Sequence, residues 1–354
     1  MSKFSNARIN GLSPYVPGEQ PKEREYIKLN TNESPYPPSP LAIEYAKEQA
    51  KLSYLYPDPD VKELTEAVAK NLGVDKEQVI MTNGSDEVLN FAFMAYCDKN
   101  TPAVFADITY GFYKVFADIN GIESKIIPLN DDFTLSVDDY IKEKGTVFIA
   151  NPNAPTGIAI GLNEIERLLK SNPDRIVVID QAYVDFGNES AVKLVNKYDN
   201  LLVTETFSKS RSLAGGRLGY GVASKQIIQD LMRIKYSTNP YNVNRMTAGA
   251  GLGAILDKEY FNANCKKIID EREDLKSKLK RLGFTMTDSK TNFVFVKSEK
   301  ISGKNLYLQL KNRGILVRHF DSDKIKDYNR ITIGNRAQMQ ALIKAITEIL
   351  EEIK

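Results

Sequence analysis

The sequence of 354 residues predicts an α/β protein in which helices cover both faces of a mostly parallel sheet. Short apolar runs alternate with helical periodicity from about residue 41 to about residue 225, a pattern typical of strand–helix–strand units. Four of these runs end in polar residues, at Thr82, Asn151, Asp180 and Thr204. With 42% hydrophobic residues, a chain of this length can bury a large core, and we expect two unequal domains.

The predicted elements divide the chain into three parts. An N-terminal arm, residues 1–40, precedes a large domain over residues 41–250 that opens with helical periodicity at 41–52 and 61–72. A helical stretch then continues to about residue 282. Apolar runs at 292–296 and 330–333, followed by a helix from about 337 to 353, predict a smaller α+β domain over residues 251–354.

A lysine between two serines, Ser208-Lys209-Ser210, follows the apolar run 201–203, and Arg217 stands eight residues after the lysine. The lysine thus leaves the sheet at the C-terminal end of a strand, where open α/β sheets bind ligands. A partly desolvated lysine beside a second cation loses its proton easily, and the free amine can form a Schiff base with an aldehyde. The planar arginine suits a phosphate. An aldehyde and a phosphate on one small molecule suggest pyridoxal 5'-phosphate, although most lysines flanked by serines are solvated loop residues.

The run Ile176–Ile179 leads directly into Asp180, which predicts a buried parallel strand with a carboxylate at its C-terminal edge. A pyridine ring works as an electron sink only while its nitrogen is protonated, and a neighbouring anion keeps it so. Asp180 could instead cap a turn or helix, as strand-end aspartates often do. Because Lys209 follows at the next strand end, we favour the functional interpretation, in which Tyr183 could hydrogen-bond the phenolic oxygen of the cofactor.

Two further strand ends carry motifs. The segment Asn151–Gly157 contains two prolines and a glycine, which predict a rigid non-helical turn. Gly84 precedes Ser85 and Asp86 at the start of a helical pattern, and free amides at a helix start bind anions. The same residues also suit an ordinary N-cap and a first-turn acid, so this motif supports a phosphate site without proving one.

In order and spacing, these motifs resemble the fold-type I pyridoxal-phosphate aminotransferases. Four flanking segments make the chain most similar to the histidinol-phosphate aminotransferases within them: Leu29–Tyr36, Tyr54–Pro59, Gly314–Arg318 and Asn329–Gly334. The resemblance covers essentially the whole chain. It implies the fold-type I architecture, a large domain that binds pyridoxal phosphate and a small C-terminal domain.

The resemblance implies that Lys209 is the Schiff-base lysine and moves a proton between substrate Cα and cofactor C4′. It further implies that Asp180 pairs with the pyridine nitrogen, that Tyr183 lies near the ring hydroxyl and that Tyr110 stacks on the ring face. Five residues would surround the cofactor phosphate: Ser85, Asp86, Thr206, Ser208 and Arg217.

The resemblance also implies a homodimer, because Tyr56 would reach the cofactor phosphate of the neighbouring subunit. The arm, residues 1–40, would pack against the small domain and the partner. Arg330 would bind the substrate carboxylate bidentately. Further candidates for the side-chain end of the substrate, including its phosphate, are Tyr15, Asn32, Tyr241 and Arg318.

The implied reaction is a ping-pong transamination of histidine biosynthesis, which interconverts L-histidinol phosphate and 2-oxoglutarate with imidazole-acetol phosphate and L-glutamate. Three alternatives stay open: a threonine-phosphate decarboxylase-like lyase, an aromatic or general amino acid aminotransferase, and a non-catalytic pyridoxal-phosphate binding module. A nucleotide-binding oxidoreductase is disfavoured, because the glycines of 215–221 do not form the dinucleotide fingerprint that opens a helix.

Two positions depart from the family pattern. The family usually has Asn immediately before Pro-Thr-Gly, where it hydrogen-bonds the phenolic oxygen of the cofactor, and here that residue is Ala154. Asn153 is a weaker candidate for this contact, because a shift of one residue on an extended segment turns the side chain the other way. Gln181 stands where the family often has Glu, with no chemical role at stake.

The overall composition limits the function classes. Lys plus Arg number 48 and Asp plus Glu 46, and the absence of a long basic run with interleaved aromatics argues against nucleic acid. Cys97 and Cys265 lie far apart and indicate reduced thiols in a cytoplasmic protein without a metal site. The single histidine, His319, is expected in a loop. The N-terminus has no apolar signal core, and no run is long enough for a membrane span.

Overall fold

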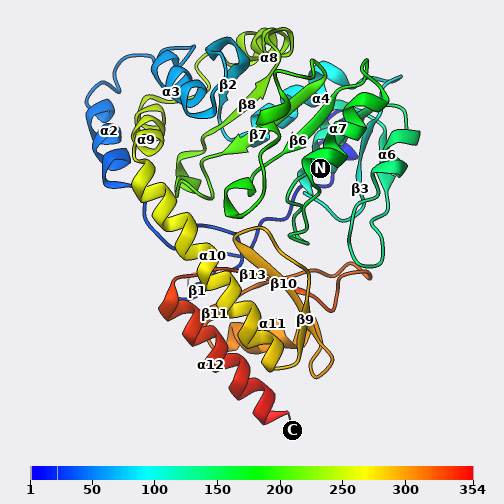
Figure 1. Cartoon of the computed structure of the whole chain (residues 1–354), viewed down its shortest axis with the longest axis vertical. Coiled ribbons are helices and arrows are strands. Elements are labelled where there is room, and N and C mark those ends of the chain that lie inside the picture. Colours follow the sequence, from blue (N-terminus) through cyan, green and yellow to red (C-terminus); the bar gives the residue numbers. More distant parts are fainter. Residues whose placement is uncertain (1, 22, 354) are drawn as a thin grey trace.

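A computed structural model describes residues 2–21 and 23–353. The chain forms a large domain around a seven-stranded sheet and a small domain around a four-stranded sheet, with the long helix α10 passing from one to the other (Figure 1). The predicted fold class, a mostly parallel sheet covered by helices together with a smaller α+β domain, is confirmed.

The large sheet has five adjacent parallel strands and an antiparallel strand, β8, inserted near one edge. In spatial order the strands are β2 (Val79–Thr82), β8 (Gly219–Ala223), β7 (Leu201–Thr206), β6 (Val177–Asp180), β5 (Thr146–Ala150), β3 (Ala103–Ala106) and β4 (Ser124–Ile127). The register pairs Asp180 with both Ala150 and Thr204. The C-terminal ends of β5, β6 and β7 therefore meet at one edge of the sheet.

Two helical layers cover this sheet. One face packs against α4 (Ser85–Tyr96), α5 (Phe112–Asn120) and α8 (Lys225–Thr238), and the other against α3 (Lys62–Leu72), α6 (Val137–Lys142), α7 (Leu162–Ser171) and α9 (Arg245–Leu256). α2 (Pro40–Ala50) lies on α9. Strand side chains alternate between the layers: Val177 and Ile179 point to the second, and Val178 to the first. By the same alternation Asp180 faces the α4–α5–α8 layer.

The small domain is built on an antiparallel sheet in the order β12 (Arg318–His319), β13 (Asn329–Thr332), β10 (Phe293–Ser298) and β9 (Phe284–Met286). Its helices are α10 (Lys258–Arg281), α11 (Gly303–Asn312) and α12 (Arg336–Glu352). The arm carries α1 (Ala7–Asn10) and β1 (Ile27–Lys28), and β1 pairs with β11 (Ile315–Leu316) of the small domain. α9 runs through the predicted boundary at 250/251. His319, expected in a loop, lies in β12.

The part of the chain that the structure describes also contains four short 3-10 helices: η1 (Lys76–Gln78), η2 (Val184–Phe186), η3 (Ala191–Leu194) and η4 (Ala214–Gly216). Cys97 and Cys265 are free and buried, and burial raises the pKa of each thiol to about 12. Within residues 2–21 and 23–353, none of the helices has the length and apolar character needed to cross a bilayer.

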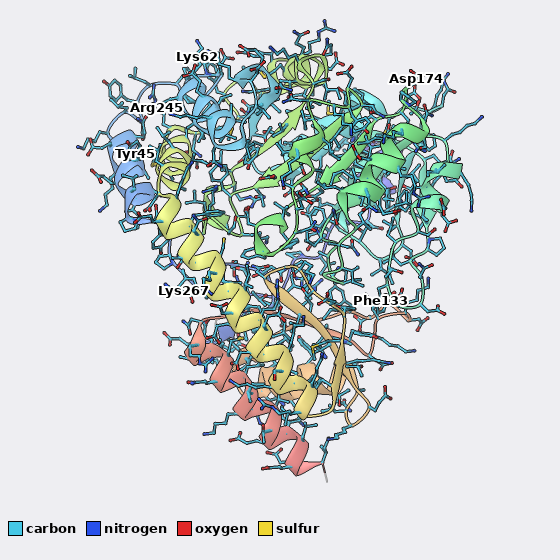
Figure 2. All side chains as sticks on the ribbon, in the orientation of Figure 1. Tyr45, Lys62, Phe133, Asp174, Arg245 and Lys267 are labelled. Atoms are coloured by element: carbon cyan, nitrogen blue, oxygen red, sulfur yellow. The ribbon has the colours of Figure 1, made fainter. Side chains whose placement is uncertain are left out.

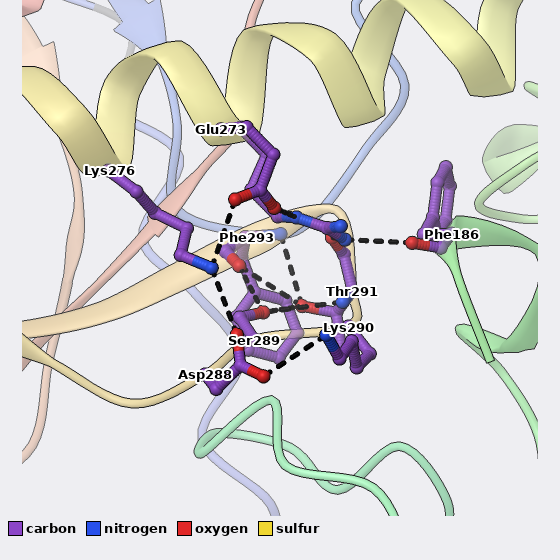
Figure 3. Close-up of polar contacts among 9 residues, drawn as sticks. Phe186, Glu273, Lys276, Asp288, Ser289, Lys290, Thr291 and Phe293 are labelled. Atoms are coloured by element: carbon purple, nitrogen blue, oxygen red, sulfur yellow. Dashed lines mark hydrogen bonds and ion pairs between the residues drawn. The ribbon is translucent and has the colours of Figure 1, made fainter.

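A turn of the small domain, residues 287–293, docks on the proline-rich turn of the large domain. Figure 3 shows the polar contacts within this turn and from it to α10. Lys290 N donates to Gly157 O at 2.8 Å. Gly157 has φ +77°, and a Cβ at this position would lie 2.4 Å from Ser289 Oγ, so only glycine fits the contact. Arg272 ties the same turn to η2, since its Nη1 donates to Thr291 O and Phe186 O, each at 2.8 Å.

Candidate active site

A cavity of 330 Å³ opens at the C-terminal edge of the large sheet. It is lined from β5, β6, β7, the start of α4 and the arm. The lining residues are Thr31, Glu33, Ser85, Asp86, Tyr110, Ala150, Pro152, Ala154, Asp180, Ala182, Tyr183, Thr206, Ser208, Lys209, Ala214, Gly215 and Arg217. The structure therefore brings together all the residues predicted to touch the cofactor except Asn153 and Tyr56.

Lys209 follows β7 and projects into this cavity. Its Nζ donates to Thr31 O at 3.3 Å. Burial lowers the pKa of the Lys209 ammonium to about 8, and the charges of Arg330 and Arg217 act in the same direction, against the opposing effect of Glu33 and Asp86. Near neutral pH a far larger fraction of this lysine than of a solvent-exposed one is thus the free amine, the form that can add to a carbonyl or accept a proton.

Asp180 ends β6 and is almost fully buried. Its Oδ2 accepts from Tyr113 Oη at 3.0 Å, and its Oδ1 accepts from Thr204 Oγ1 and Ala182 N, each at 3.3 Å. Burial raises the pKa of this carboxyl to about 6, and the neighbouring Asp86 adds to the rise although the three donors oppose it. A cationic ring nitrogen in the cavity would be the natural partner for this costly buried anion.

An anion cradle lies at the start of α4. Ser85 and Asp86 stand in the first turn of this helix, where backbone N–H groups have no intrahelical acceptor. The helix start can lie this close to the sheet because Gly219 has no Cβ, which would be 2.3 Å from Ser85 N. Opposite this helix start, Thr206 Oγ1 lies 3.0 Å from Ser208 Oγ, which accepts from Arg217 Nη1 at 3.4 Å. Peptide N–H groups, hydroxyls and a guanidinium thus converge as they would on a phosphate.

Asp86 has a second role in this cradle. Its carboxylate accepts from Arg217 Nη2 at 3.0 Å and from Tyr110 Oη at 2.7 Å. It therefore orients the guanidinium and the aromatic ring at once. Burial, followed by the charge of Asp86, raises the pKa of Tyr110, so its hydroxyl stays a donor.

Tyr183 and Asn32 meet at the opposite wall. Asn32 Nδ2 donates to Tyr183 Oη at 2.8 Å, and Asn32 itself is anchored to the small domain, because Thr332 Oγ1 donates to its Oδ1 at 3.1 Å. Asn32 adopts a left-handed backbone with φ +57°, which asparagine tolerates better than most residues. Burial raises the pKa of Tyr183, which keeps this phenol protonated.

The predicted anion-binding arginines lie just beyond the cavity lining. Arg330 of β13 is part-buried, donates from Nη2 to Asn30 O at 3.0 Å, and lies over the Phe293 ring at 5.3 Å. Its Nε has no partner among the described residues. Arg318 donates to Val16 O and Pro17 O, each at 3.3 Å, and so holds the arm. Beside them, Tyr15 packs on the Phe112 ring at 4.4 Å.

Three predicted site residues lie elsewhere. Asn153 faces away from the cavity, where its Nδ2 donates to Ile108 O at 2.9 Å and its Oδ1 accepts from Thr109 Oγ1 at 2.8 Å. Ala154 lines the cavity instead, as alternation along an extended segment requires. Tyr56 and Tyr241 stack on each other at 4.7 Å on the outer surface.

Sequence reasoning missed four residues that complete the site. Thr31 and Glu33 line the cavity from the arm, and Tyr113 and Thr204 hold Asp180. Thr204 could have been found, because it occupies the strand position opposite Asp180 in a parallel register. Nothing in the sequence distinguishes Tyr113 from the other 17 tyrosines.

These residues fit pyridoxal 5'-phosphate. The cavity offers a part-deprotonated lysine for its aldehyde, a buried carboxylate for its ring nitrogen and a cradle of amides, hydroxyls and one arginine for its phosphate. Tyr183 and Tyr110 also line the cavity. With the parallel sheet, this donor set defines a protein that performs amine chemistry on a small carbonyl cofactor.

Comparison with known proteins agrees with this class. Residues 24–346 match the family described as aminotransferase class I and II. The chain is 46% identical over 354 residues to the histidinol-phosphate aminotransferase of Brachyspira hyodysenteriae, covering 99% of this chain and 100% of that one. It is 50% identical over 350 residues to that of Marinomonas sp., covering 98% and 99%.

Solved structures have the same fold. That of histidinol-phosphate aminotransferase from Sinorhizobium meliloti in complex with pyridoxal-5'-phosphate superposes with a TM-score of 0.91 at 21% identity, covering 100% of this chain and 99% of that one. L-threonine-O-3-phosphate decarboxylase from Porphyromonas gingivalis has a TM-score of 0.78 at 25% identity, covering 92% and 99%.

Fold and site together define an aminotransferase of class I and II. Within that class, the chain belongs to the histidinol-phosphate aminotransferase family.

Proposed function

We propose that the chain is a pyridoxal-phosphate-dependent transaminase of histidine biosynthesis, which interconverts L-histidinol phosphate and 2-oxoglutarate with imidazole-acetol phosphate and L-glutamate. The observation that carries the proposal is the cavity that joins Lys209, with its pKa lowered to about 8, to the buried Asp180 and the anion cradle. Near-full-length identity of 46–50% to histidinol-phosphate aminotransferases supports the substrate.

The residues that line the cavity have distinct tasks in this proposal. Lys209 holds the cofactor in the resting state and then, as a free amine, removes the proton from the substrate Cα. Asp180 keeps the ring nitrogen protonated, and Tyr183 donates to the phenolic oxygen. The amides of Ser85 and Asp86 bind the cofactor phosphate with Thr206, Ser208 and Arg217 (all five around the cradle). When bound, pyridoxal phosphate supplies the electron sink for the negative charge left on Cα.

Substrate anions would be bound by Arg330. Its planar fork suits both the carboxylate of glutamate and the phosphate ester of histidinol phosphate, so one site can serve both half-reactions. The free Nε of Arg330 and its electrostatic effect on Lys209 support this placement. Arg318, Tyr15 and Asn32 surround the same end, with Tyr15 on the arm.

A homodimer is part of the proposal. Large apolar and aromatic side chains are exposed on the loop between α2 and α3 and around the start of α9: Leu52, Tyr54, Leu55, Tyr56, Tyr241 and Met246. Tyr54 is 80% exposed and Tyr56 78%, which is unusual for aromatic residues without a partner protein. A second subunit on this surface would receive Tyr56, and with it Tyr241, in its own site.

A cytoplasmic location stays a prediction.

The test is a spectrophotometric half-reaction assay. The purified enzyme loaded with pyridoxal phosphate is mixed with glutamate, and loss of the visible cofactor band is followed; histidinol phosphate is then tested in the same way. Both amines should bleach the band, and imidazole-acetol phosphate should restore it. Response to neither amine would reject transamination.

Two competing functions have their own signatures. A lyase would release CO₂ from O-phosphothreonine and form no 2-oxoglutarate from glutamate. An aromatic aminotransferase would give a higher kcat/KM for phenylalanine than for histidinol phosphate. Either result would replace the proposed substrate and keep the cofactor chemistry.

A further inference from the structure

The loop that carries Tyr56 stands over a cavity. It joins α2 to α3, and a cavity of 370 Å³ lies between it and those helices, lined also by α9. Pro57, Asp58 and Arg245 are among the lining residues. The loop therefore has little apolar packing beneath it, and its conformation depends on polar ties.

Arg245 provides the most complete of these ties. Its Nη2 donates to Tyr56 O at 2.7 Å and its Nε donates to Leu55 O at 3.1 Å, so one guanidinium holds two successive carbonyls. Its Nη1 lies 3.3 Å from Gln49 Oε1 of α2. Arg245 is the first residue of α9, whose start is capped by Asn244. Figure 2 shows Arg245 near Tyr45 of α2, at the edge of the large domain. A planar fork of donors thus joins a rigid helix start to the loop.

Two further contacts restrain the loop on either side. The Tyr241 ring stacks on the Tyr56 ring at 4.7 Å with an interplanar angle of 22°, which holds the phenol itself. On the far side, the buried Lys235 of α8 donates from Nζ to Pro59 O. Arg245 contacts the Tyr56 backbone directly, and its side chain is only partly buried. Removal of this side chain therefore leaves the carbonyls of Leu55 and Tyr56 open to water.

We infer that Arg245 is a positioning residue that fixes the Leu55–Tyr56 backbone, so that the Tyr56 hydroxyl enters the partner subunit's site already oriented toward the cofactor phosphate. The inference rests on the proposed function and dimer. If the loop were mobile, cofactor binding would have to order the Tyr56 hydroxyl, and the lost conformational entropy would lower the affinity. A loop that Arg245 already holds in one conformation loses less entropy on binding. Arg245 would thus affect the active site of the other subunit, where Tyr56 comes from the subunit of Arg245 and Lys209 comes from its partner.

The first measurement is cofactor affinity. Arg245→Met and Tyr56→Phe should each raise the Kd of the apoprotein for pyridoxal phosphate by about tenfold, because both variants weaken the same contact. Arg245→Lys should fall between, since one ammonium cannot hold two carbonyls as a fork does. Arg233→Met is the matched control: Arg233 is on α8 with an 81% exposed side chain, and this variant should bind as the wild type does.

Hybrid dimers test whether the effect crosses the interface. In a hybrid of a Lys209→Ala subunit and an Arg245→Met subunit, the one intact lysine is served by a loop whose Arg245 is present. In a hybrid of wild type and a Lys209→Ala/Arg245→Met subunit, the intact lysine is served by a loop without it. We expect wild-type cofactor release in the first hybrid and release about tenfold faster in the second.

The outcomes separate the possible causes. Faster cofactor release from the first hybrid than from the second would place the effect within one subunit and overturn the inference. Equal release rates from the two hybrids would also overturn it, because they would indicate a merely structural role for Arg245. Equal thermal unfolding of the Arg245→Met and Arg233→Met apoproteins would confirm that folding is intact. Failure of the proposed function would show separately, because the wild-type dimer would then not respond to glutamate or histidinol phosphate.

Discussion

The hydroxyl of Tyr113 donates a 3.0 Å hydrogen bond to Oδ2 of Asp180, and both side chains are almost fully buried. Tyr113 lies on α5 and Asp180 at the end of β6, so the bond joins a helix of one layer to the edge of the sheet. The carboxylate that would face the cofactor nitrogen is thus held from behind by a phenol. Its orientation does not depend on the ligand.

Tyr113→Phe should destabilise the apoprotein by about 1–3 kcal/mol at pH 7.5, because a buried charged acceptor loses a donor. The loss should shrink below pH 6, where Asp180 is protonated. Urea unfolding measures both. The matched control is Tyr140→Phe: Tyr140 is equally buried, and its hydroxyl has no partner among the described residues, so this change should cost little. Equal costs for the two variants would contradict the role given to the Tyr113 bond.

Asp180→Asn should alter the pH dependence of apoprotein stability. The pKa of Asp180 is raised from 3.8 to about 6 in the folded state, so between these values the folded protein binds the extra proton. Stability from this group is therefore lost as pH rises from about 4 to 6, by an upper limit of about 3 kcal/mol, and stays lost above. Unfolding curves at pH 4 to 7.5 should show that Asn removes this loss, while Asp174→Asn on the surface does not.

With cofactor bound, Asp180→Asn should lower kcat by about 100-fold or more.

Lys209 should titrate near pH 8 in the apoprotein rather than near 10.5. Reductive ¹³C-methylation followed by NMR gives this midpoint, and the Lys209 signal is assigned by its absence from the spectrum of Lys209→Ala. The same variant should have no transaminase activity. Arg330→Met should move the midpoint upward, because removing a nearby cation favours the ammonium form. A midpoint above 10 in the wild type would refute the desolvated placement of the amine.

Arg330→Ala should raise KM for both glutamate and histidinol phosphate by more than about tenfold, since a charge-assisted fork to a substrate anion is lost. Arg330→Lys should recover part of the effect, because it keeps the charge and loses the fork. Steady-state kinetics of both half-reactions measure this, with Arg233→Ala as the control. An unchanged KM for both substrates would remove Arg330 from the anion site.

Ala154→Asn should tighten cofactor binding by about tenfold, because it places an amide donor on a wall that is now apolar. Asn153→Ala is the opposite case. It removes the bonds to Ile108 and Thr109 from the turn and should lower stability while leaving cofactor affinity nearly unchanged. Equilibrium titration with pyridoxal phosphate and thermal unfolding separate the two effects. Weaker binding by Ala154→Asn would mean that the wall has no room for the amide.

The sequence alone was enough to predict the strand-end residues. Lys209 and Asp180 each follow an apolar run, and neighbouring parallel strands end at the same edge, so their proximity follows from the topology. The prediction of Asn153 as a weaker cofactor candidate was wrong, because alternation along the extended segment turns Asn153 away and points Ala154 into the cavity.

Contacts between distant segments were beyond sequence reasoning. Tyr113 could not be chosen from 18 tyrosines, because its bond to Asp180 depends on how α5 packs on the sheet. The tie from Arg245 to Leu55 and Tyr56 spans about 190 residues and depends on α2 lying on α9. The left-handed Arg217, with φ +51°, likewise needs the surrounding cradle to hold it.

The order of apolar runs, glycines and charged residues along the chain was sufficient to predict the α/β class and to select Lys209 and Asp180 as candidate site residues. These features extend over a few residues and act through the strand that carries them. The pKa of Lys209, the support behind Asp180 and the outward placement of Tyr56 were decided only by the folded chain. Desolvation and hydrogen bonding depend on which side chains meet in space, and that is a property of the packing between layers and domains.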